Sequence, residues 1–103
     1  MTTNIKNLID KHVVIAFIKG EKHAPACKFS YEVINILNTF NIDYYTVNVL
    51  TNNTLRENIK LYSQWPTIPQ IYINSIFIGG AEILINLYKN NELQEILEQA
   101  FNI

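Results

Sequence analysis

The sequence is poor in cysteine, and Cys27 is its only one. A chain with one cysteine cannot close an internal disulfide, so any sulfur chemistry has to recruit a small thiol, another protein or a second copy of the chain. A free thiol without a disulfide framework is typical of a reducing compartment. We therefore expect a cytoplasmic protein, or a protein of an organellar matrix if a presequence has been removed.

The sequence also lacks an excess of charge and any long apolar run. Its formal net charge is -1 and its isoelectric point is near 6.1, which gives no reason to expect nucleic acid or an anionic membrane surface as a partner. The longest apolar runs, such as residues 13–18, are far too short to span a bilayer. The N-terminus has neither a secretory apolar core nor an Arg/Ser-rich transit composition. Nucleic-acid-binding and membrane-bound classes of protein are therefore disfavoured.

The length and the hydrophobic content fit one domain. The chain has 103 residues, of which 49% are hydrophobic, so we expect residues 1–103 to form a single domain around an adequate core. Apolar periodicity predicts helices over residues 3–11, 27–41, 54–62, 83–88 and 93–101, strands over residues 13–18, 45–49, 70–73 and 76–79, and a polar loop over residues 20–26. The first helix follows Thr3 and should turn Ile5 and Leu8 inward, and in the second Phe29 and Phe40 belong to the apolar residues that recur near helical spacing.

The order of these elements specifies the sheet. The first two strands are joined through a helix, so they should run parallel through a right-handed crossover. The last two strands are separated by Asn74-Ser75, which is the spacing of a hairpin, and should run antiparallel. We therefore expect an α/β sandwich in which helices cover both faces of a four-stranded mixed sheet.

Cys27 follows the first predicted strand and opens the second predicted helix. A helix start offers unpaired backbone N–H groups and the positive end of the helix dipole, which favour a thiolate. Lys19, Lys22 and Lys28 are near in the sequence and should favour the thiolate further. The pattern predicts a reactive sulfur at Cys27, whereas Ser30 is equally well interpreted as an ordinary first-turn residue or as a catalytic group.

Two further segments should meet this thiol, because ligands of open α/β sheets gather at the carboxyl ends of the strands. In Trp65-Pro66-Thr67-Ile68-Pro69-Gln70 two prolines precede a strand, so we expect at least one cis X-Pro bond. The backbone of Thr67 and Ile68 should then be free to bind, with Trp65 supporting the turn. In Gly79-Gly80-Ala81-Glu82 a strand ends and a helix begins, so free N–H groups there could bind a carboxylate.

Taken together, these segments resemble those of a known family. Lys19-Gly20, Cys27-Lys28-Phe29-Ser30, the block from Trp65 to Gln70, and Gly79-Gly80 followed by Glu82 stand in the order and spacing of a monothiol glutaredoxin, over nearly the whole chain. The resemblance implies a thioredoxin-like (glutaredoxin) three-layer sandwich, glutathione binding and a [2Fe-2S] cluster that bridges two protomers.

The resemblance also implies roles for single residues. Cys27 would be the catalytic sulfur that faces glutathione and the ligand of the cluster. Lys19 and Lys60 would lie near the glycine carboxylate of glutathione. Thr67 and Ile68, before a cis Pro69, would pair with its cysteine through their backbones. The γ-glutamyl end would be held by Gly80, Ala81 and Glu82, and Phe29 would be a further glutathione contact. The chemistry of the residues agrees, because glutathione has two carboxylates and one ammonium, and these segments offer lysines, a helix N-terminus and one acid.

Ligand counting explains why the cluster should be shared. A thiolate-ligated [2Fe-2S] core needs four sulfurs and each chain supplies one cysteine, so two chains and two glutathiones complete the set. We expect a homodimer when the cluster is bound and a monomer in its absence.

The chain departs from the family pattern at two places. Lys28 stands where the family has glycine, and Ala81-Glu82 stands where the family has Cys-Asp.

Three hypotheses of function remain open. The preferred hypothesis is a glutathione-dependent [2Fe-2S] carrier that passes its cluster to acceptor apo-proteins, in iron-sulfur cluster assembly and redox homeostasis, by ligand exchange at Cys27. The alternative is an enzyme, a glutathione-dependent thiol-disulfide oxidoreductase that acts on glutathione mixed disulfides. A redox-inactive interaction module with a buried thiol is a third hypothesis. A zinc site is disfavoured, because one cysteine and two histidines, His12 and His23, fall short of a structural zinc set.

Overall fold

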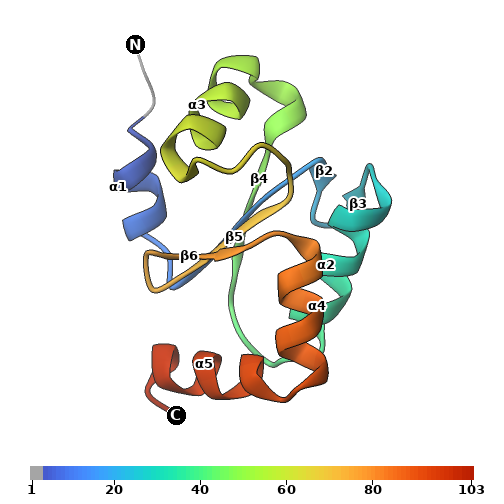
Figure 1. Ribbon diagram of the computed structural model, residues 1–103, viewed down its shortest axis with the longest axis vertical. Helices are drawn as coiled ribbons and strands as arrows, with labels where there is room; N and C mark the ends of the chain where they lie inside the picture. Colours follow the sequence, from blue (N-terminus) through green and yellow to red (C-terminus); the bar gives the residue numbers. More distant parts are fainter. Residues whose placement is uncertain (1–3) are drawn as a thin grey trace.

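The computed structural model describes residues 4–103, and a four-stranded sheet forms its middle layer (Figure 1). The strands lie in the order β4-β1-β5-β6, with β1 spanning Val14–Ile18, β4 Tyr45–Asn48, β5 Gln70–Ile73 and β6 Ile76–Gly79. Strand β1 runs parallel to β4 and antiparallel to β5, and β5 runs antiparallel to β6. The predicted mixed sheet is confirmed.

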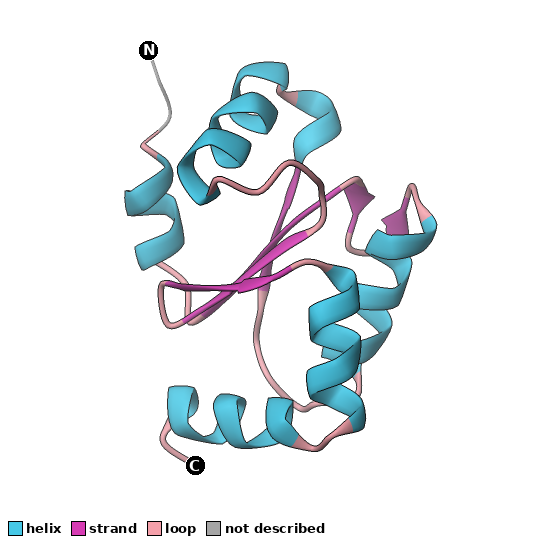
Figure 2. Ribbon diagram, in the orientation of Figure 1, coloured by secondary structure: helices cyan, strands magenta, loops and turns pink. Residues whose placement is uncertain are grey.

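Helices cover both faces of this sheet (Figure 2). On one face lie α1 (Ile5–Asp10) and α3 (Asn53–Ser63), and on the other lie α2 (Lys28–Asn38), α4 (Ala81–Lys89) and α5 (Glu92–Phe101). A short 3-10 helix, η1 (Val49–Thr51), connects β4 to α3. The arrangement is the expected three-layer sandwich. Among residues 4–103, no helix combines the length and the apolar character needed to cross a bilayer.

Strand β1 supplies side chains to the cores on both faces. All five of its residues are buried. Because side chains alternate between faces along a strand, Val14, Ala16 and Ile18 enter the core under α2, α4 and α5, while Ile15 and Phe17 enter the core under α1 and α3. A continuous apolar run is what a strand covered on both faces requires.

The N-terminal helix is shorter than predicted. Thr3 lies outside the described residues. The side chain of Asn4 caps α1, because its oxygen accepts a hydrogen bond from the backbone N–H of Asn7 at 3.0 Å. Ile5 is buried as expected, but Leu8 is only half-buried, and Ile9 is the fully buried residue instead. Residues four apart share a helix face, so Ile5 and Ile9 turn inward together.

The segment predicted as a loop between β1 and α2 contains a small hairpin. Its two strands, β2 (Gly20–Glu21) and β3 (Ala24–Pro25), pair antiparallel, and the N–H of Ala26 donates a hydrogen bond to the carbonyl of Lys19 at 2.8 Å. Gly20 has a φ of +94°, and a Cβ there would lie 2.5 Å from the nitrogen of Ala26. Only glycine fits such a position, so Gly20 allows the chain to return to the end of β1.

Helix α2 begins where predicted but ends earlier. Its last residue is Asn38 rather than Asn41, and the hydroxyl of Thr39 donates to a carbonyl of the last turn at 2.6 Å. Phe29, which follows the apolar period of the helix, is 57% exposed. It lies in the first turn of the helix, where the core gives way to a surface cavity that its ring helps to line. Phe40 packs partly buried against the core.

The β5–β6 hairpin matches its prediction. Asn74 and Ser75 have φ values of 55° and 67°, and positive φ at both positions is what a two-residue type I′ turn requires. The hydroxyl of Ser75 also donates to the carboxylate of Asp10 at 2.7 Å. This contact ties the hairpin to the end of α1.

Replacing Gly20 with alanine should lower the free energy of unfolding by about 1–3 kcal/mol, because the new Cβ would meet the backbone of Ala26 at a strained positive φ. Urea unfolding followed by circular dichroism measures the loss. Gly80→Ala is the matched control, since φ there is -96° and the nearest contacts of a Cβ would be 3.4 Å. The control should lose less stability than Gly20→Ala, because only the weaker preference for alanine at an N-cap acts there. Equal stability of the two variants would contradict the role assigned to Gly20.

Candidate functional site

The thiol of Cys27 lies at the N-terminus of α2, as predicted. Cys27 is the N-cap residue, with an extended backbone (φ -149°, ψ 158°), and its sulfur accepts the capping hydrogen bond that an oxygen usually accepts. The backbone N–H of Ser30 donates to Sγ at 3.4 Å, and the thiol donates to the hydroxyl oxygen of Ser30 at 3.1 Å. Cys27 remains partly exposed, so the helix start holds the sulfur without enclosing it.

The surroundings of Cys27 favour the thiolate. Partial burial raises the pKa of the thiol, but hydrogen bonding with the side chain and the backbone of Ser30, and with the backbone of Phe29, lowers it. The positive charge of Lys19 lowers it further, and the resulting pKa of Cys27 is below the ordinary thiol value of 9.0. A lower pKa increases the fraction of thiolate at neutral pH, and the thiolate is both the nucleophile and the metal ligand.

The three lysines predicted to favour the thiolate do not act alike. Lys19 is the one whose charge lowers the pKa of Cys27. Lys22 is engaged elsewhere, since its Nζ donates to the carbonyl of Tyr44 at 2.6 Å and lies 3.9 Å from the centre of the Tyr44 ring. Lys28 is exposed and is not among the groups that shift this pKa. The prediction therefore holds for Lys19 alone, because closeness in sequence does not bring a charge close to the sulfur.

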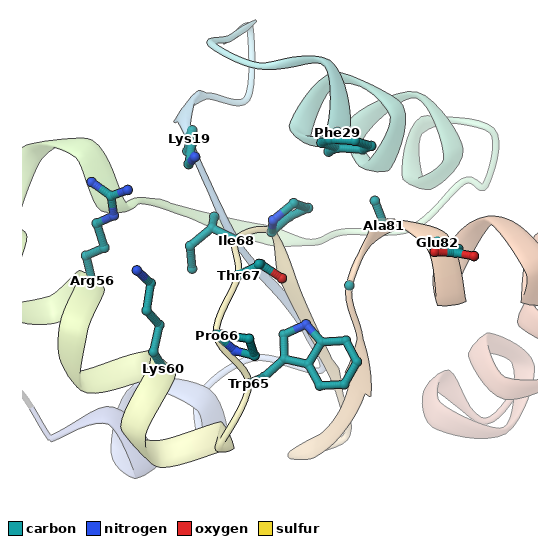
Figure 3. Close-up of a pocket in the computed structure, with 12 residues that line it drawn as sticks. Lys19, Phe29, Arg56, Lys60, Trp65, Pro66, Thr67, Ile68, Ala81 and Glu82 are labelled. Atoms are coloured by element: carbon teal, nitrogen blue, oxygen red, sulfur yellow. The ribbon is translucent and has the colours of Figure 1, made fainter.

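A cavity of about 470 Å³ lies at this end of the sheet (Figure 3). The end of β1, the first turn of α2, α3, the proline-rich turn and the start of α4 all contribute to it. Its lining residues are Lys19, Phe29, Arg56, Lys60, Trp65, Pro66, Thr67, Ile68, Pro69, Gly80, Ala81 and Glu82. Every predicted glutathione residue is in this set except Cys27, which precedes Phe29 by two positions at the same helix end. The structure thus brings the three predicted segments together.

The proline-rich turn presents free backbone groups to the cavity. The Ile68–Pro69 peptide bond is cis, as expected for one of the two X-Pro bonds. The buried side-chain amide of Gln70 donates to the carbonyls of Trp65 and Thr67, at 3.1 and 3.2 Å, and so fixes the turn from the core side. Within residues 4–103 the N–H groups of Thr67 and Ile68 have no hydrogen-bond partner. An extended ligand can therefore pair with this turn as a strand would.

Helix α4 begins at the cavity without a capping side chain. Gly80 is its N-cap residue, and no side chain accepts hydrogen bonds from its first turn. Free N–H groups and the positive end of the dipole favour an anion at such a position. Glu82 is exposed in the same turn, so an ammonium group could be bound beside the anion.

Sequence reasoning did not identify Arg56 as a cavity residue, and it assigned Trp65 only to support of the turn. Arg56 lies one turn before Lys60 on α3, and residues four apart share one helix face. This spacing is a signal that the sequence contained. Two side-chain nitrogens, Arg56 Nε and Trp65 Nε1, are buried without a hydrogen-bond partner. Within the described residues, no other buried side-chain nitrogen or oxygen lacks one. Trp65 does also support the turn, because its ring packs edge-on against Phe77 at 5.6 Å.

Charged groups of opposite sign line the two ends of the cavity (Figure 3). Lys19, Arg56 and Lys60 gather at one end, and Glu82 at the start of α4 lies at the other. Lys60 is partly balanced by Glu57, whose carboxylate is 3.5 Å from its Nζ. The arrangement suits an elongated ligand that carries a carboxylate at the cationic end and both a carboxylate and an ammonium at the α4 end.

Residues 4–103 do not bring together a set of metal ligands by themselves. In the part of the chain that the structure describes, no three His, Cys, Asp or Glu side chains come together in a metal-binding group. His23 is exposed, and His12 stacks on the ring of Tyr45 with the ring centres 4.1 Å apart. An iron-sulfur cluster held by Cys27 would need its other ligands from outside the chain.

The fold and the site define a thioredoxin-like thiol protein, in which a helix-start cysteine, a cis-proline turn and an uncapped helix start lie at one end of a four-stranded sheet. The family model described as Glutaredoxin matches residues 13–78. An uncharacterized monothiol glutaredoxin (ycf64-like) of Synechocystis sp. is 49% identical over 96 residues, which cover 93% of this chain and 90% of that protein.

Two further relatives agree with this match. Monothiol glutaredoxin-S7, chloroplastic, of Oryza sativa is 43% identical over 100 residues, which cover 97% of this chain and 60% of that protein. The solution structure of reduced poplar apo GrxS14 has a TM-score of 0.83 at 42% identity, covering 96% of this chain and 91% of that chain. The chain therefore belongs to the glutaredoxin family, among its monothiol members.

Replacing Lys19 with glutamine should raise the pKa of Cys27, because the charge that favours the thiolate is removed. The thiolate fraction at neutral pH should fall about two- to fivefold, as expected for one solvent-screened charge. The ultraviolet absorbance of the thiolate, followed as a function of pH, measures the change. Lys22→Gln is the control, since its ammonium group is occupied at Tyr44, and it should leave the titration unchanged. A larger effect at Lys22 than at Lys19 would refute the assignment.

Proposed function

We propose that this monothiol glutaredoxin binds glutathione in the cavity and holds a [2Fe-2S] cluster shared between two protomers. Each protomer contributes the Cys27 thiolate and one bound glutathione, and the dimer delivers the cluster to acceptor proteins of iron-sulfur cluster assembly. The observation that carries the proposal is the position of Cys27, a partly exposed sulfur with a lowered pKa beside a cavity that is cationic at one end and acidic at the other.

The charges and free backbone groups of the cavity support glutathione as the ligand. Its glycine carboxylate would lie at the end with Lys19, Arg56 and Lys60, and its cysteine would pair with the backbone of the turn at Thr67 and Ile68. The γ-glutamyl carboxylate would accept hydrogen bonds from the start of α4, with its ammonium near the side chain of Glu82. In this pose each charged group of the tripeptide meets an opposite charge or a helix terminus.

The buried nitrogen atoms without partners support the same ligand. Arg56 Nε and Trp65 Nε1 both belong to residues that line the cavity. A buried donor without an acceptor costs free energy, commonly about 1–3 kcal/mol. A bound molecule rich in carboxylate and amide oxygens would reduce this cost by offering a hydrogen-bond acceptor to either nitrogen.

The ligand inventory supports a shared cluster. Cys27 is the only sulfur ligand of the chain that can be a thiolate, and within residues 4–103 no three His, Cys, Asp or Glu side chains come together in a metal-binding group. A thiolate-ligated [2Fe-2S] core takes four sulfurs, which two copies of Cys27 and two glutathione thiolates provide. Because half of the ligands are free small molecules, an acceptor protein can replace them by ligand exchange.

The lowered pKa of Cys27 favours a second candidate function, reduction of glutathione mixed disulfides. The Cys27 thiolate would attack the glutathione sulfur of the mixed disulfide, releasing the protein thiolate and forming a Cys27–glutathione disulfide. A second glutathione thiolate would then attack that disulfide, releasing oxidised glutathione and regenerating the Cys27 thiolate. The chain has no second cysteine to resolve the intermediate, so free glutathione has to perform this step.

Reconstitution with iron, sulfide and glutathione should give a brown dimer, and Cys27→Ser should remain a colourless monomer because it lacks the ligating thiolate. The visible spectrum and the elution volume in size-exclusion chromatography measure both properties. Reconstitution without glutathione is the control and should also fail. A colourless monomer that rapidly turns over a glutathione mixed disulfide would favour the oxidoreductase, and colour retained in Cys27→Ser would overturn the ligand assignment.

Replacing Arg56 with glutamine should weaken glutathione binding about tenfold, because one charge-assisted hydrogen bond to the glycine carboxylate is lost. Isothermal titration calorimetry with glutathione measures the dissociation constant. Lys89→Gln is the matched loss of one positive charge in the last turn of α4, outside the cavity, and should leave the affinity unchanged. If both variants bind like the parent protein, the cationic end is not the carboxylate site.

A further inference from the structure

Two buried side chains of β5 lie on the core side of the proline-rich turn. Gln70 has an exposed fraction of 0% and Tyr72 of 1%, and neither lines the cavity. Residues two apart on a strand share a face of the sheet, so the two side chains lie next to each other. The hydroxyl of Tyr72 donates a hydrogen bond to Oε1 of Gln70 at 3.3 Å. The function proposed for the cavity assigns no role to this hydroxyl.

The side-chain amide of Gln70 has a partner for each of its polar atoms. An amide side chain offers two donor hydrogens on nitrogen and an acceptor oxygen. Nε2 donates to the carbonyls of Trp65 and Thr67 at 3.1 and 3.2 Å, and Oε1 accepts from Tyr72. A flipped amide would place its oxygen against two carbonyl oxygens and lose both bonds. The amide therefore has one favoured orientation, which the hydroxyl of Tyr72 completes.

The ring that carries this hydroxyl is held in place by its neighbours. It packs edge-on against Phe17, with the ring centres 5.9 Å apart, and against Phe77 at 5.3 Å. Burial raises the pKa of Tyr72 to about 12, and the opposing effect of the Ser63 side chain is smaller. The hydroxyl therefore keeps its proton at neutral pH, where it remains a donor to Gln70.

One peptide group of the turn connects this buried pair to the cavity. The carbonyl of Thr67 and the N–H of Ile68 belong to the same planar, trans peptide group and point in opposite directions. Since Gln70 holds the carbonyl on the core side, the N–H points away from the core. Thr67 and Ile68 both line the cavity, and within residues 4–103 this N–H has no hydrogen-bond partner. Fixing the carbonyl thus also fixes a donor that a ligand can use.

We propose that Tyr72 is a positioning residue for the ligand of the cavity, because through Gln70 it fixes the Thr67–Ile68 peptide group before the ligand binds. A backbone group that is already ordered reduces the entropy lost on binding. Without the hydroxyl, Oε1 of Gln70 is buried without a donor, and the amide moves to regain one. The turn then loses its support, although every residue that contacts the ligand is unchanged.

The inference deepens the proposed function and rests on it, because it takes glutathione as the ligand that pairs with the turn. The hydrogen bonds behind the turn need no ligand, so the order of the turn can be measured on the protein alone. A parent protein that does not bind glutathione would refute the proposed function. The inference fails instead when the turn keeps its order without the tyrosine hydroxyl.

The experiment compares Tyr72→Phe with Tyr44→Phe by NMR relaxation of the backbone amides and by calorimetric titration with glutathione. Tyr72→Phe keeps the ring and should lower the order parameters of Thr67 and Ile68. It should also weaken glutathione binding about three- to tenfold, the effect of one lost hydrogen bond. Tyr44→Phe is the matched control, because its hydroxyl donates to the side-chain oxygen of Asn38 at 2.5 Å, outside the cavity. It should change neither property.

A second variant tests whether Tyr72 acts through Gln70. Gln70→Met removes the amide, keeps the length of the side chain, and should weaken glutathione binding at least as much as Tyr72→Phe. Adding Tyr72→Phe to Gln70→Met should then weaken binding less than about twofold further, because both changes remove the same support. Fully additive losses would overturn the inference, as would an ordered turn and an unchanged affinity in folded Tyr72→Phe.

A measurement on the unmodified protein covers the case in which these variants do not fold. The hydroxyl proton of Tyr72 should give its own signal in the proton NMR spectrum, because a buried, hydrogen-bonded hydroxyl exchanges slowly with water. This signal should show a nuclear Overhauser effect to the side-chain amide of Gln70. A Tyr72 hydroxyl that exchanges as fast as that of Tyr31, whose side chain is exposed, would overturn the inference.

Discussion

The main chain of Lys19 is the fixed point on which the site depends. Its carbonyl accepts the N–H of Ala26 at 2.8 Å, and its N–H donates to the hydroxyl of Ser30 at 3.1 Å. The first bond closes the small hairpin that follows Gly20, and the second ties the first turn of α2 to the residue after β1. Because β1 is buried between two cores, the sulfur of Cys27 is held by the sheet rather than by a surface loop. A thiol on a loop would lose conformational entropy each time it was brought to a ligand.

Two helix starts share the end of the sheet that this fixed point defines, and they favour negative charge for the same reason. The N-terminus of α2 holds the sulfur of Cys27, and the N-terminus of α4 carries no capping side chain. Both offer free N–H groups and the positive end of a helix dipole. With Arg56 and Lys60 on α3, the cavity attracts anions although the chain has a net charge of -1. The preference for an anionic ligand is therefore a property of the local geometry, which composition alone does not reveal.

Most of the fold and much of the site follow from the sequence, and the exceptions have physical causes. The buried run of β1 and the spacing around Asn74-Ser75 are local patterns, so strands and topology were predictable. The β2–β3 hairpin has only two residues in each strand, too few for alternation to be visible. Phe29 follows the helical period but lies where the core ends. Lys22 is nearer to Cys27 in the sequence than Lys19 is, but its ammonium group is bound to Tyr44. Distance along the sequence therefore could not show which of the two lysines acts on the thiol.

The two proposed functions, cluster carrier and oxidoreductase, would use the same sulfur, and the chain itself does little to choose between them. Both chemistries begin with the thiolate of Cys27, which its hydrogen bonds and the charge of Lys19 favour. They differ in the next bond that the sulfur forms, to iron in one case and to the sulfur of glutathione in the other. In either case the chain provides no second thiol, so under both proposals glutathione would supply the partner sulfur. A bound glutathione whose thiolate is free would permit a shared cluster, whereas one in a disulfide would lead to exchange, so under these proposals the redox state of glutathione would determine which reaction begins.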